Sequence, residues 1–129
     1  MKYTVVIDGE FPTLNEFIDA NRIRRGSWSK GNQMKRDNQD LINLSLRSQL
    51  RGAHIDDPVH LTYRFYCSNR RKDKDNICGY FHKIFQDSLV ESQIINNDSW
   101  KYITGFKDEF FFDKESPRIE VEIESQGGN

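Results

Sequence analysis

The chain has 129 residues, of which 36% are hydrophobic, 12% aromatic and 30% charged; these values predict one globular domain, residues 1–129, and exclude a disordered chain. The net charge of −1, taken alone, argues against a nucleic-acid partner. No apolar run approaches the roughly 20 residues of a membrane helix, and the opening residues MKYTVVIDGE carry acids where a signal peptide has small apolar residues, so we expect a cytoplasmic protein without membrane contact.

The N-terminal part of the chain contains a predicted strand, a short helix and a basic segment. Residues 2–7 are β-branched and aromatic, which predicts a strand that ends at the turn dipeptide Asp8-Gly9, and a helical turn is expected near residues 16–20. Residues 21–36, which we call the basic arm, contain no acid, and their glycines and serines predict a mobile loop in the middle of the arm. The basic side chains of the arm are Arg22, Arg24, Arg25, Lys30, Lys35 and Arg36.

The basic arm shows that charge is distributed unevenly. Residues 108–124 hold seven acids against two basic side chains, so the near-neutral total conceals two opposed patches. Because a partner responds to the local patch, the arm is a candidate nucleic-acid contact. Trp28 in the arm has two interpretations: an anchor packed in the core under the loop, or an exposed ring that stacks on a base.

A helix and a strand follow the arm. From about residue 33 to residue 51, apolar residues recur every three to four positions, which predicts a helix that ends at Gly52. Residues 58–67 alternate, which predicts a strand. The side chains on its apolar face are Val59, Leu61, Tyr63, Phe65 and Cys67. The strand leads to a cationic run, which consists of Arg70, Arg71 and Lys72.

A second helix is predicted after Asp75. Its apolar stripe consists of Ile77, Phe81, Ile84, Phe85 and Leu89. A second edge, expected to face solvent or a site, consists of Asn76, Tyr80, Lys83 and Asp87. Two irregularly placed cysteines, Cys67 and Cys78, support neither a disulfide framework nor a zinc knuckle, so we expect reduced structural thiols.

Two further strands are predicted at residues 100–106 and 118–124. Between them, residues 110–112, three consecutive phenylalanines, either continue a strand into the core or seal a subunit interface. The tail, residues 125–129, is expected to be frayed. Together the elements predict an α/β (α+β) fold in which two main helices cover one face of a small mixed sheet of four strands.

Three aspartates flank the second helix. Asp73 and Asp75 lie two residues apart and can present both carboxylates to one point in extended backbone, and Asp98 follows the helix. Converging carboxylates are unfavourable unless a cation lies between them. Hard oxygen ligands of this kind bind Mg²⁺ or Mn²⁺ together with phosphate oxygens, and Lys83 would add a positive charge for a transition state.

Each acid also has a simpler interpretation. Asp75 can be the N-cap of the helix, and Asp98 can be an ordinary turn acid. Other kinds of site are excluded by spacing, because Ile77 and Cys78 stand at a ligand position and at the turn-glycine position of a calcium EF-hand loop. The histidines lack the spacing of a zinc site, and no glycine-rich phosphate loop is present.

The order of these motifs resembles the RusA family of Holliday-junction resolvases. The residues that carry the resemblance are the cationic run, the pattern Asp73-x-Asp75-Asn76, a helix with Lys83 and the segment FQDSL at 85–89, and Asn97-Asp98 before a strand. The resemblance extends over most of the chain. It implies a homodimeric, Mg²⁺-dependent endonuclease that cuts four-way DNA junctions by paired nicks in DNA recombination and repair.

The resemblance also assigns roles to residues. Asp73, Asp75 and Asp98 match the family's metal-binding acids, and Lys83 matches its catalytic lysine. The lysine departs from the family pattern, because it follows the second acid by eight residues rather than by about one helical turn, as if four residues near GYFH had been inserted. Such an insertion adds about 6 Å along a helix and keeps the same face. Asn97 also stands where the pattern often has another acid.

We expect the basic arm and the cationic run to contact DNA phosphates without reading sequence. The acidic face formed by Glu120, Glu122 and Glu124 should lie away from DNA. A two-fold dimer would present two copies of the site to the two equivalent strands of a junction. The alternatives are a catalytically weak or inactive junction-binding protein of the same fold, and a partner-binding domain in which the acids are caps.

Overall fold

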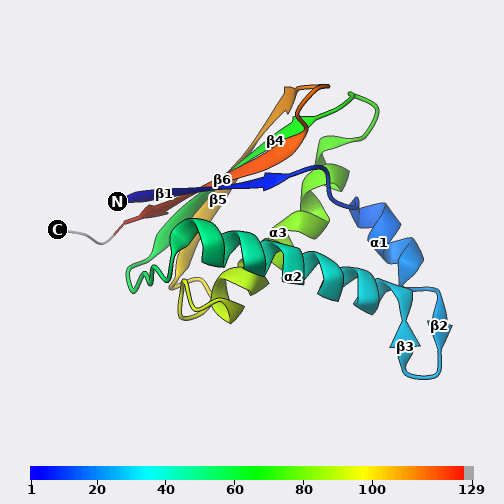
Figure 1. Cartoon of the computed structure of the whole chain (residues 1–129), viewed down its shortest axis with the longest axis horizontal. Helices are drawn as coiled ribbons and strands as arrows, with labels where there is room; N and C mark the ends of the chain where they lie inside the picture. The colour runs from blue at the N-terminus through cyan, green and yellow to red at the C-terminus, as the bar shows by residue number, and fades with distance from the viewer. Residues whose placement is uncertain (127–129) are drawn as a thin grey trace.

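The structure of the chain is a computed structural model that describes residues 1–126 (Figure 1). The elements in chain order are β1 (Lys2–Asp8), α1 (Leu14–Ala20), β2 (Arg24–Arg25), β3 (Trp28–Ser29), α2 (Lys30–Leu50), β4 (Val59–Cys67), α3 (Lys74–Glu91), β5 (Ile103–Phe112) and β6 (Arg118–Ser125). Within the described residues, no helix combines the length and the apolar character needed to cross a membrane.

Four strands form the main sheet, in the order β1-β6-β4-β5. β4 pairs with β5 in parallel, whereas the pairs β4 with β6 and β1 with β6 are antiparallel. The predicted mixed sheet with helices on one face is therefore confirmed, with the short helix α1 in addition to the two main helices α2 and α3 (Figure 1). β5 is one edge of this sheet and β1 is the other.

The core lies between the sheet and the helices. Each strand contributes alternate residues, so that Val5, Val121 and Tyr63 form one cross-strand row of the inward face. The predicted apolar stripe of α3 packs against these rows, because Phe81, Ile84, Phe85 and Leu89 are fully buried. The opposite face of the sheet carries the acidic residues, and there Arg64 pairs with Glu109 at 2.9 Å and with Glu122 at 3.7 Å.

Local signals in the sequence define the helix ends. Thr13 and Glu16 form a capping box at the start of α1, in which the Thr13 hydroxyl accepts from the Glu16 N–H and the Glu16 carboxylate accepts from the Thr13 N–H. Ser29 caps α2 by accepting from the Asn32 N–H at 3.1 Å, so this helix begins before the predicted residue 33. It ends at Leu50, close to the predicted end, with Arg51 as a left-handed C-cap and then Gly52, the predicted stop, at a φ of 78°.

The middle of the basic arm is a hairpin, so the prediction of a loop without a regular element there is wrong. β2 and β3 pair antiparallel on either side of Gly26, whose φ of 59° permits a tight turn. The Lys30 N–H donates to the Ile23 carbonyl at 3.0 Å and closes the hairpin, which extends past α1 away from the sheet (Figure 1). Trp28 is 41% exposed, so it is not a core anchor.

Tyr80 is buried, which corrects its predicted place on an exposed edge of α3. Its side chain is 2% exposed, and its ring lies 4.8 Å from the ring of Phe17 in α1. Its hydroxyl accepts a 2.8 Å hydrogen bond from the side-chain amide of Asn38 in α2. The prediction failed because α1 and α2 cover this side of α3, and periodicity within one helix cannot show a neighbouring helix.

The C-terminal strands differ from the predicted ones in their bounds. β5 starts and ends later than predicted, so residues 110–112 continue a strand. The Phe110 ring stacks on Phe65 at 5.2 Å, whereas Phe112 is exposed. Ser125 belongs to β6 and the Gln126 N–H donates to the Pro58 carbonyl at 2.8 Å, so the predicted fraying is wrong for these two residues. The rest of the predicted tail, residues 127–129, lies outside the described residues.

Candidate active site

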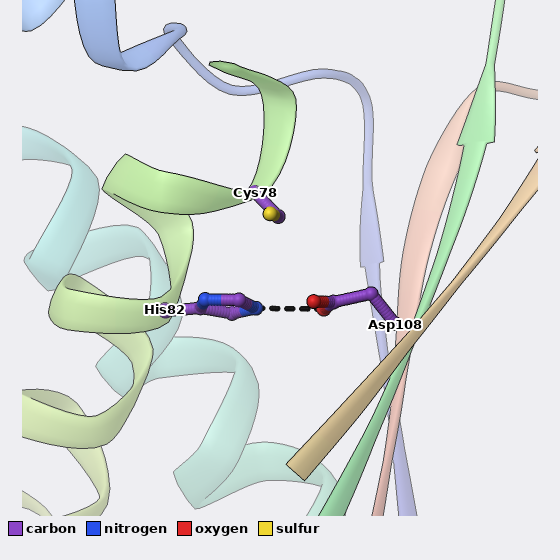
Figure 2. Close-up of side chains that lie close together, drawn as sticks. All are labelled: Cys78, His82 and Asp108. Atoms are coloured by element: carbon purple, nitrogen blue, oxygen red, sulfur yellow. Dashed lines mark hydrogen bonds and ion pairs between the residues drawn. The ribbon is translucent and has the colours of Figure 1, made fainter. Parts of the chain in front are cut away.

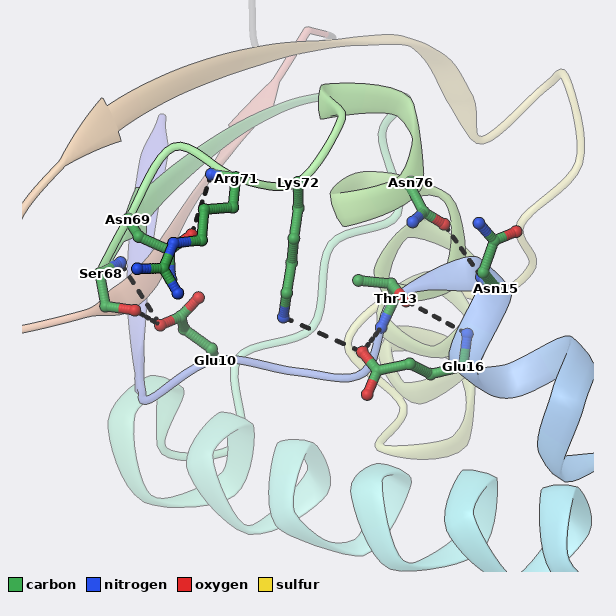
Figure 3. Close-up of polar contacts among 9 residues, drawn as sticks. All are labelled: Glu10, Thr13, Asn15, Glu16, Ser68, Asn69, Arg71, Lys72 and Asn76. Atoms are coloured by element: carbon green, nitrogen blue, oxygen red, sulfur yellow. Dashed lines mark hydrogen bonds and ion pairs between the residues drawn. The ribbon is translucent and has the colours of Figure 1, made fainter.

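The loop between β4 and α3 is attached to the segment that follows β1. Both the backbone N–H and the hydroxyl of Ser68 donate to the carboxylate of Glu10, the former at 3.3 Å (Figure 3). Within the loop, the Asn69 side chain accepts from the Arg71 N–H at 2.9 Å. These contacts hold the backbone that carries the cationic run.

The first turn of α3 is attached to α1. The Asn76 side-chain oxygen accepts from the Asn15 N–H at 2.9 Å, and the Lys72 ammonium lies 3.9 Å from the Glu16 carboxylate (Figure 3). The pKa of Glu16 is lowered, and the largest cause is the hydrogen bond from the Thr13 backbone N–H. Partial burial raises this pKa, whereas the Thr13 hydroxyl and the Lys72 charge lower it further. The start of α3 is therefore held by residues far away in the sequence.

Asp73 and Asp75 lie at this anchored start. Asp73 is the N-cap of α3, yet its side chain makes no capping hydrogen bond, and Asp75 lies in the first turn. The Asp75 carboxylate accepts only the N–H of its neighbour Asn76, at 2.9 Å, among the described residues. The simpler interpretation of Asp75 as the N-cap is wrong. Both carboxylates are exposed and leave oxygens free for a cation or solvent.

Asp98 and Lys83 line one hollow of about 350 Å³ beside the middle of α3. Gly79 lines it as well, and this residue stands one helical turn after Asp75, where the family pattern has its lysine. A Cβ atom at Gly79 would lie 3.3 Å from the Leu14 side chain of α1, so a larger side chain would start in a tight contact. Lys83, one turn further along, reaches the same hollow without that contact.

The described residues do not bring all three aspartates into one close cluster. The hollow with Asp98 is lined by neither Asp73 nor Asp75. The one group of Cys, His, Asp or Glu side chains in residues 1–126 whose ligand atoms all lie within 4.8 Å of one another is a different group. The assignment of the three aspartates as metal ligands stays a prediction.

A second hollow, of about 280 Å³, lies next to Asp73 and combines cations with aromatic rings. The Arg70 guanidinium lies 5.1 Å from the centre of the Phe112 ring, and the Lys74 ammonium lies 5.7 Å from that of Phe110. Lys74 and the phenylalanines were not among the predicted DNA-binding residues. Lys74 could have been selected from the sequence, since it stands between the two acids. Its contact with Phe110 of β5 could not, because the two residues are far apart in the sequence.

The basic arm is only partly available to a partner. Lys35 lies 3.5 Å from the Asp87 carboxylate of α3, and Arg22 lies 3.3 Å from Asp19 of α1. The other basic side chains of the arm form no ion pair with any of residues 1–126, and they are Arg24, Arg25, Lys30 and Arg36. The exposed cations therefore lie mainly on the hairpin and at the start of α2.

Cys78, His82 and Asp108 form the close group that sequence reasoning missed (Figure 2). His82 Nε2 donates to Asp108 Oδ1 at 2.6 Å, which links α3 to β5. Burial, followed by the negative charge of Asp108, raises the pKa of the Cys78 thiol to about 11. The signals were the four-residue spacing of Cys78 and His82 on a helix and an acid at an inward strand position, but 26 residues separate His82 from Asp108.

A family model matches most of the chain. The family model described as endodeoxyribonuclease RusA matches residues 22–124, which include the cationic run, the three aspartates and Lys83. Comparison with curated proteins gives no match. The matched range begins after α1, although β1 completes the sheet and α1 holds the start of α3.

Proposed function

The chain belongs to the RusA endodeoxyribonuclease family, and on this premise we propose that it is a divalent-metal-dependent endonuclease that resolves Holliday junctions in DNA recombination and repair. The observation that supports this proposal most directly is the pair Asp73 and Asp75 at an anchored helix start, with free carboxylate oxygens next to a cationic run. Phosphodiester hydrolysis needs both features, because the substrate is an anion and its reaction develops further negative charge.

The donor set suits a hard cation. Asp73 makes no capping hydrogen bond and Asp98 is exposed, so both carboxylates are available to a cation. We propose that Asp73 and Asp75 hold Mg²⁺, with Mn²⁺ as a substitute, and that Asp98, which lines a hollow that neither of them reaches in this structure, completes the ligand set when the metal binds. A metal ion bound there would polarise the phosphodiester and lower the pKa of a bound water. Lys83 faces the same hollow as Asp98 and would stabilise the charge that develops on the phosphate.

The cationic run and the basic arm would position the DNA backbone. Arg71 and Lys72 adjoin the acids and have backbone or side-chain contacts that hold their loop. Arg70 and Lys74 cover aromatic rings, an arrangement that can take a phosphate and a base together. The exposed hairpin adds Arg24 and Arg25 at a distance from the acids. The acidic outer face of the sheet lies opposite the helices and would face away from DNA.

We propose a homodimer acting in the cytoplasm. A junction offers two equivalent strands, and a two-fold dimer would supply one site for each. β5 pairs only with β4 among the described strands, and its Phe106 and Phe111 are exposed, so this edge offers apolar surface to a second copy.

The test is cleavage of a synthetic four-way junction, with a linear duplex of the same sequence as the matched control. The proposal predicts paired nicks in the junction with Mg²⁺ or Mn²⁺, none after chelation, and little cleavage of the duplex. Equal cleavage of both substrates would contradict junction selectivity, and cleavage that survives chelation would contradict the metal requirement.

A second candidate is a junction-binding protein with weak or no activity. The observation that favours it is Gly79 at the position where the family has its lysine. Tight junction binding without cleavage in either Mg²⁺ or Mn²⁺ would support this candidate and exclude the nuclease.

A further inference from the structure

We propose that Cys78, His82 and Asp108 form a separate binding site for a borderline transition-metal ion, Zn²⁺ in the first instance, between α3 and β5 (Figure 2). This site differs in its donors from the carboxylate site proposed for Mg²⁺, and the inference does not depend on nuclease activity.

Three side chains from two elements point to one place. Cys78 and His82 are four residues apart on α3 and therefore lie on the same face of the helix. Asp108 extends toward them from β5, and Figure 2 shows all three side chains converging in the space between helix and strand. Their ligand atoms all lie within 4.8 Å of one another.

The position of Asp108 is unusual for a carboxylate. Asp108 is the β5 partner of Tyr63 and so continues an inward row of the sheet that is otherwise apolar. Its neighbours on the same side of β5 are Phe106 and Phe110. An inward charge on an edge strand can serve to discourage pairing with other strands, but that purpose requires neither a thiol nor an imidazole beside it.

The imidazole of His82 is held in place by aromatic rings. Its centre lies 4.5 Å from the ring of Tyr63 and 4.6 Å from the ring of Phe106. The cluster is sheltered, because Cys78 is 9% exposed and the side chains of His82 and Asp108 are 16% and 21% exposed. Fixed, partly dry ligands bind a metal ion with little loss of side-chain freedom.

The donor set selects the metal. A thiolate sulfur, an imidazole nitrogen and a carboxylate oxygen suit Zn²⁺ and Co²⁺, whereas Mg²⁺ prefers oxygen alone. Tetrahedral Zn²⁺ places such ligand atoms roughly 3 to 4 Å apart, so side-chain shifts of about 1 Å would convert the cluster into a site. Binding exchanges the thiol proton for the metal and releases that proton to solvent, and the proton of the neutral His82 ring moves from Nε2 to Nδ1, so that the nitrogen facing Asp108 is free to bind the metal. Three protein ligands leave a fourth position for water.

The location connects this site with the acids at the start of α3. Cys78 lies one turn from Asp75, and its sulfur is 3.7 Å from the Asp75 carbonyl oxygen. A metal ion that joins Cys78 to Asp108 would tie this turn to β5. Bound Zn²⁺ would thus stiffen the helix turn that carries Asp75.

Cobalt substitution provides the first test, using the full chain freed of metal by a chelator. We expect one Co²⁺ per chain with a sulfur-to-cobalt charge-transfer band in the near ultraviolet. The Cys78→Ser and His82→Gln variants should lose it, whereas Cys67→Ser, which removes the other thiol, should keep it. A spectrum without the sulfur band, or one lost in Cys67→Ser and kept in Cys78→Ser, would overturn the proposal.

Thiol protection provides a second test that needs no variant. Zn²⁺ should slow iodoacetamide modification of Cys78 at least tenfold and leave that of Cys67 unchanged, and Mg²⁺ should protect neither thiol. Equal modification of Cys78 with and without Zn²⁺ would show that the three side chains form only a hydrogen-bonded link between α3 and β5.

Discussion

Asn76 Oδ1 accepts a 2.9 Å hydrogen bond from the backbone N–H of Asn15. This N–H is one of the donors at the start of α1 that have no partner within the helix. Thr13 satisfies another by accepting from the Glu16 N–H, so α1 is capped partly by its own residue and partly by α3. The asparagine that follows the two acids in the sequence therefore orients the helix start that carries them.

The first prediction concerns this contact. Asn76→Ala leaves the Asn15 N–H without its partner and should lower the free energy of unfolding by about 1 kcal/mol, as for other lost caps. Asn76→Asp keeps an acceptor and should retain most of the stability. Urea unfolding of the two variants measures the difference. Identical midpoints for Asn76→Ala and the unchanged chain would mean that the contact does not contribute.

The second prediction concerns pH. The pKa of Glu16 is lowered in the folded chain, chiefly by the Thr13 backbone N–H. A carboxyl whose folded pKa is lowered adds stability above its unfolded pKa, and this stability is lost as the pH falls through the folded pKa. Glu16→Gln keeps the shape and removes the charge. In urea unfolding it should be less stable than the unchanged chain at pH 7, and the difference should be smaller at pH 3, whereas a gap of the same size at both pH values would contradict this origin.

Part of this architecture could be predicted from local patterns alone. The alternation in residues 58–67 and the stripe of Ile84, Phe85 and Leu89 predict β4 and α3, because these patterns report on one buried face. The family resemblance singled out the same aspartates that lie at the start and beyond the end of α3.

The rest depends on contacts between distant residues. The burial of Tyr80 requires α1 and α2 to lie beside α3. The group of His82 and Asp108 forms only when β5 packs beneath the helix. The hairpin in the basic arm was not predicted, because glycine and serine are compatible with both a loop and a tight turn.

The third prediction concerns the attachment of the hairpin. A Cβ atom at Gly31 would lie 1.9 Å from the Asn21 side-chain oxygen and 3.1 Å from the Asn21 Cα, so Gly31→Ala must turn the Asn21 side chain aside and press on the Asn21 backbone. We expect a loss of about 1 to 3 kcal/mol in the free energy of unfolding, although alanine favours helix by about 1 kcal/mol.

Gly79→Ala is the matched control for this change. Its Cβ would meet only the flexible Leu14 side chain, at 3.3 Å, so its stability should be unchanged or raised. Thermal unfolding of both variants decides the question. Equal stability of Gly31→Ala and Gly79→Ala would refute the close packing of Asn21 against α2.

The fourth prediction concerns the hairpin as a DNA contact. Replacing Arg24 and Arg25 together with glutamine should weaken junction binding and make it less sensitive to salt. Each lost phosphate contact reduces the slope of log affinity against log salt by roughly 0.9, so the double variant should lose up to about 1.8. Arg47→Gln, near the other end of α2, should keep the original slope. Binding titrations at several salt concentrations measure this, and equal slopes for all three proteins would remove the hairpin from the DNA interface.

The most direct test of the central claim compares single-turnover cleavage of a four-way junction by the unchanged chain and by Asp75→Asn in Mg²⁺. The comparison includes Asp40→Asn on the exposed face of α2 as the matched control, and binding of the junction is measured in parallel. Mutation of a residue that only supports a metal ligand typically lowers metal affinity or activity by about 10- to 100-fold. Asp75→Asn removes a proposed ligand itself, so it should reduce the cleavage rate by more than about 100-fold, while junction binding and the activity of Asp40→Asn persist. Equal cleavage by Asp75→Asn and the unchanged chain would contradict the assignment of this carboxylate to the active site.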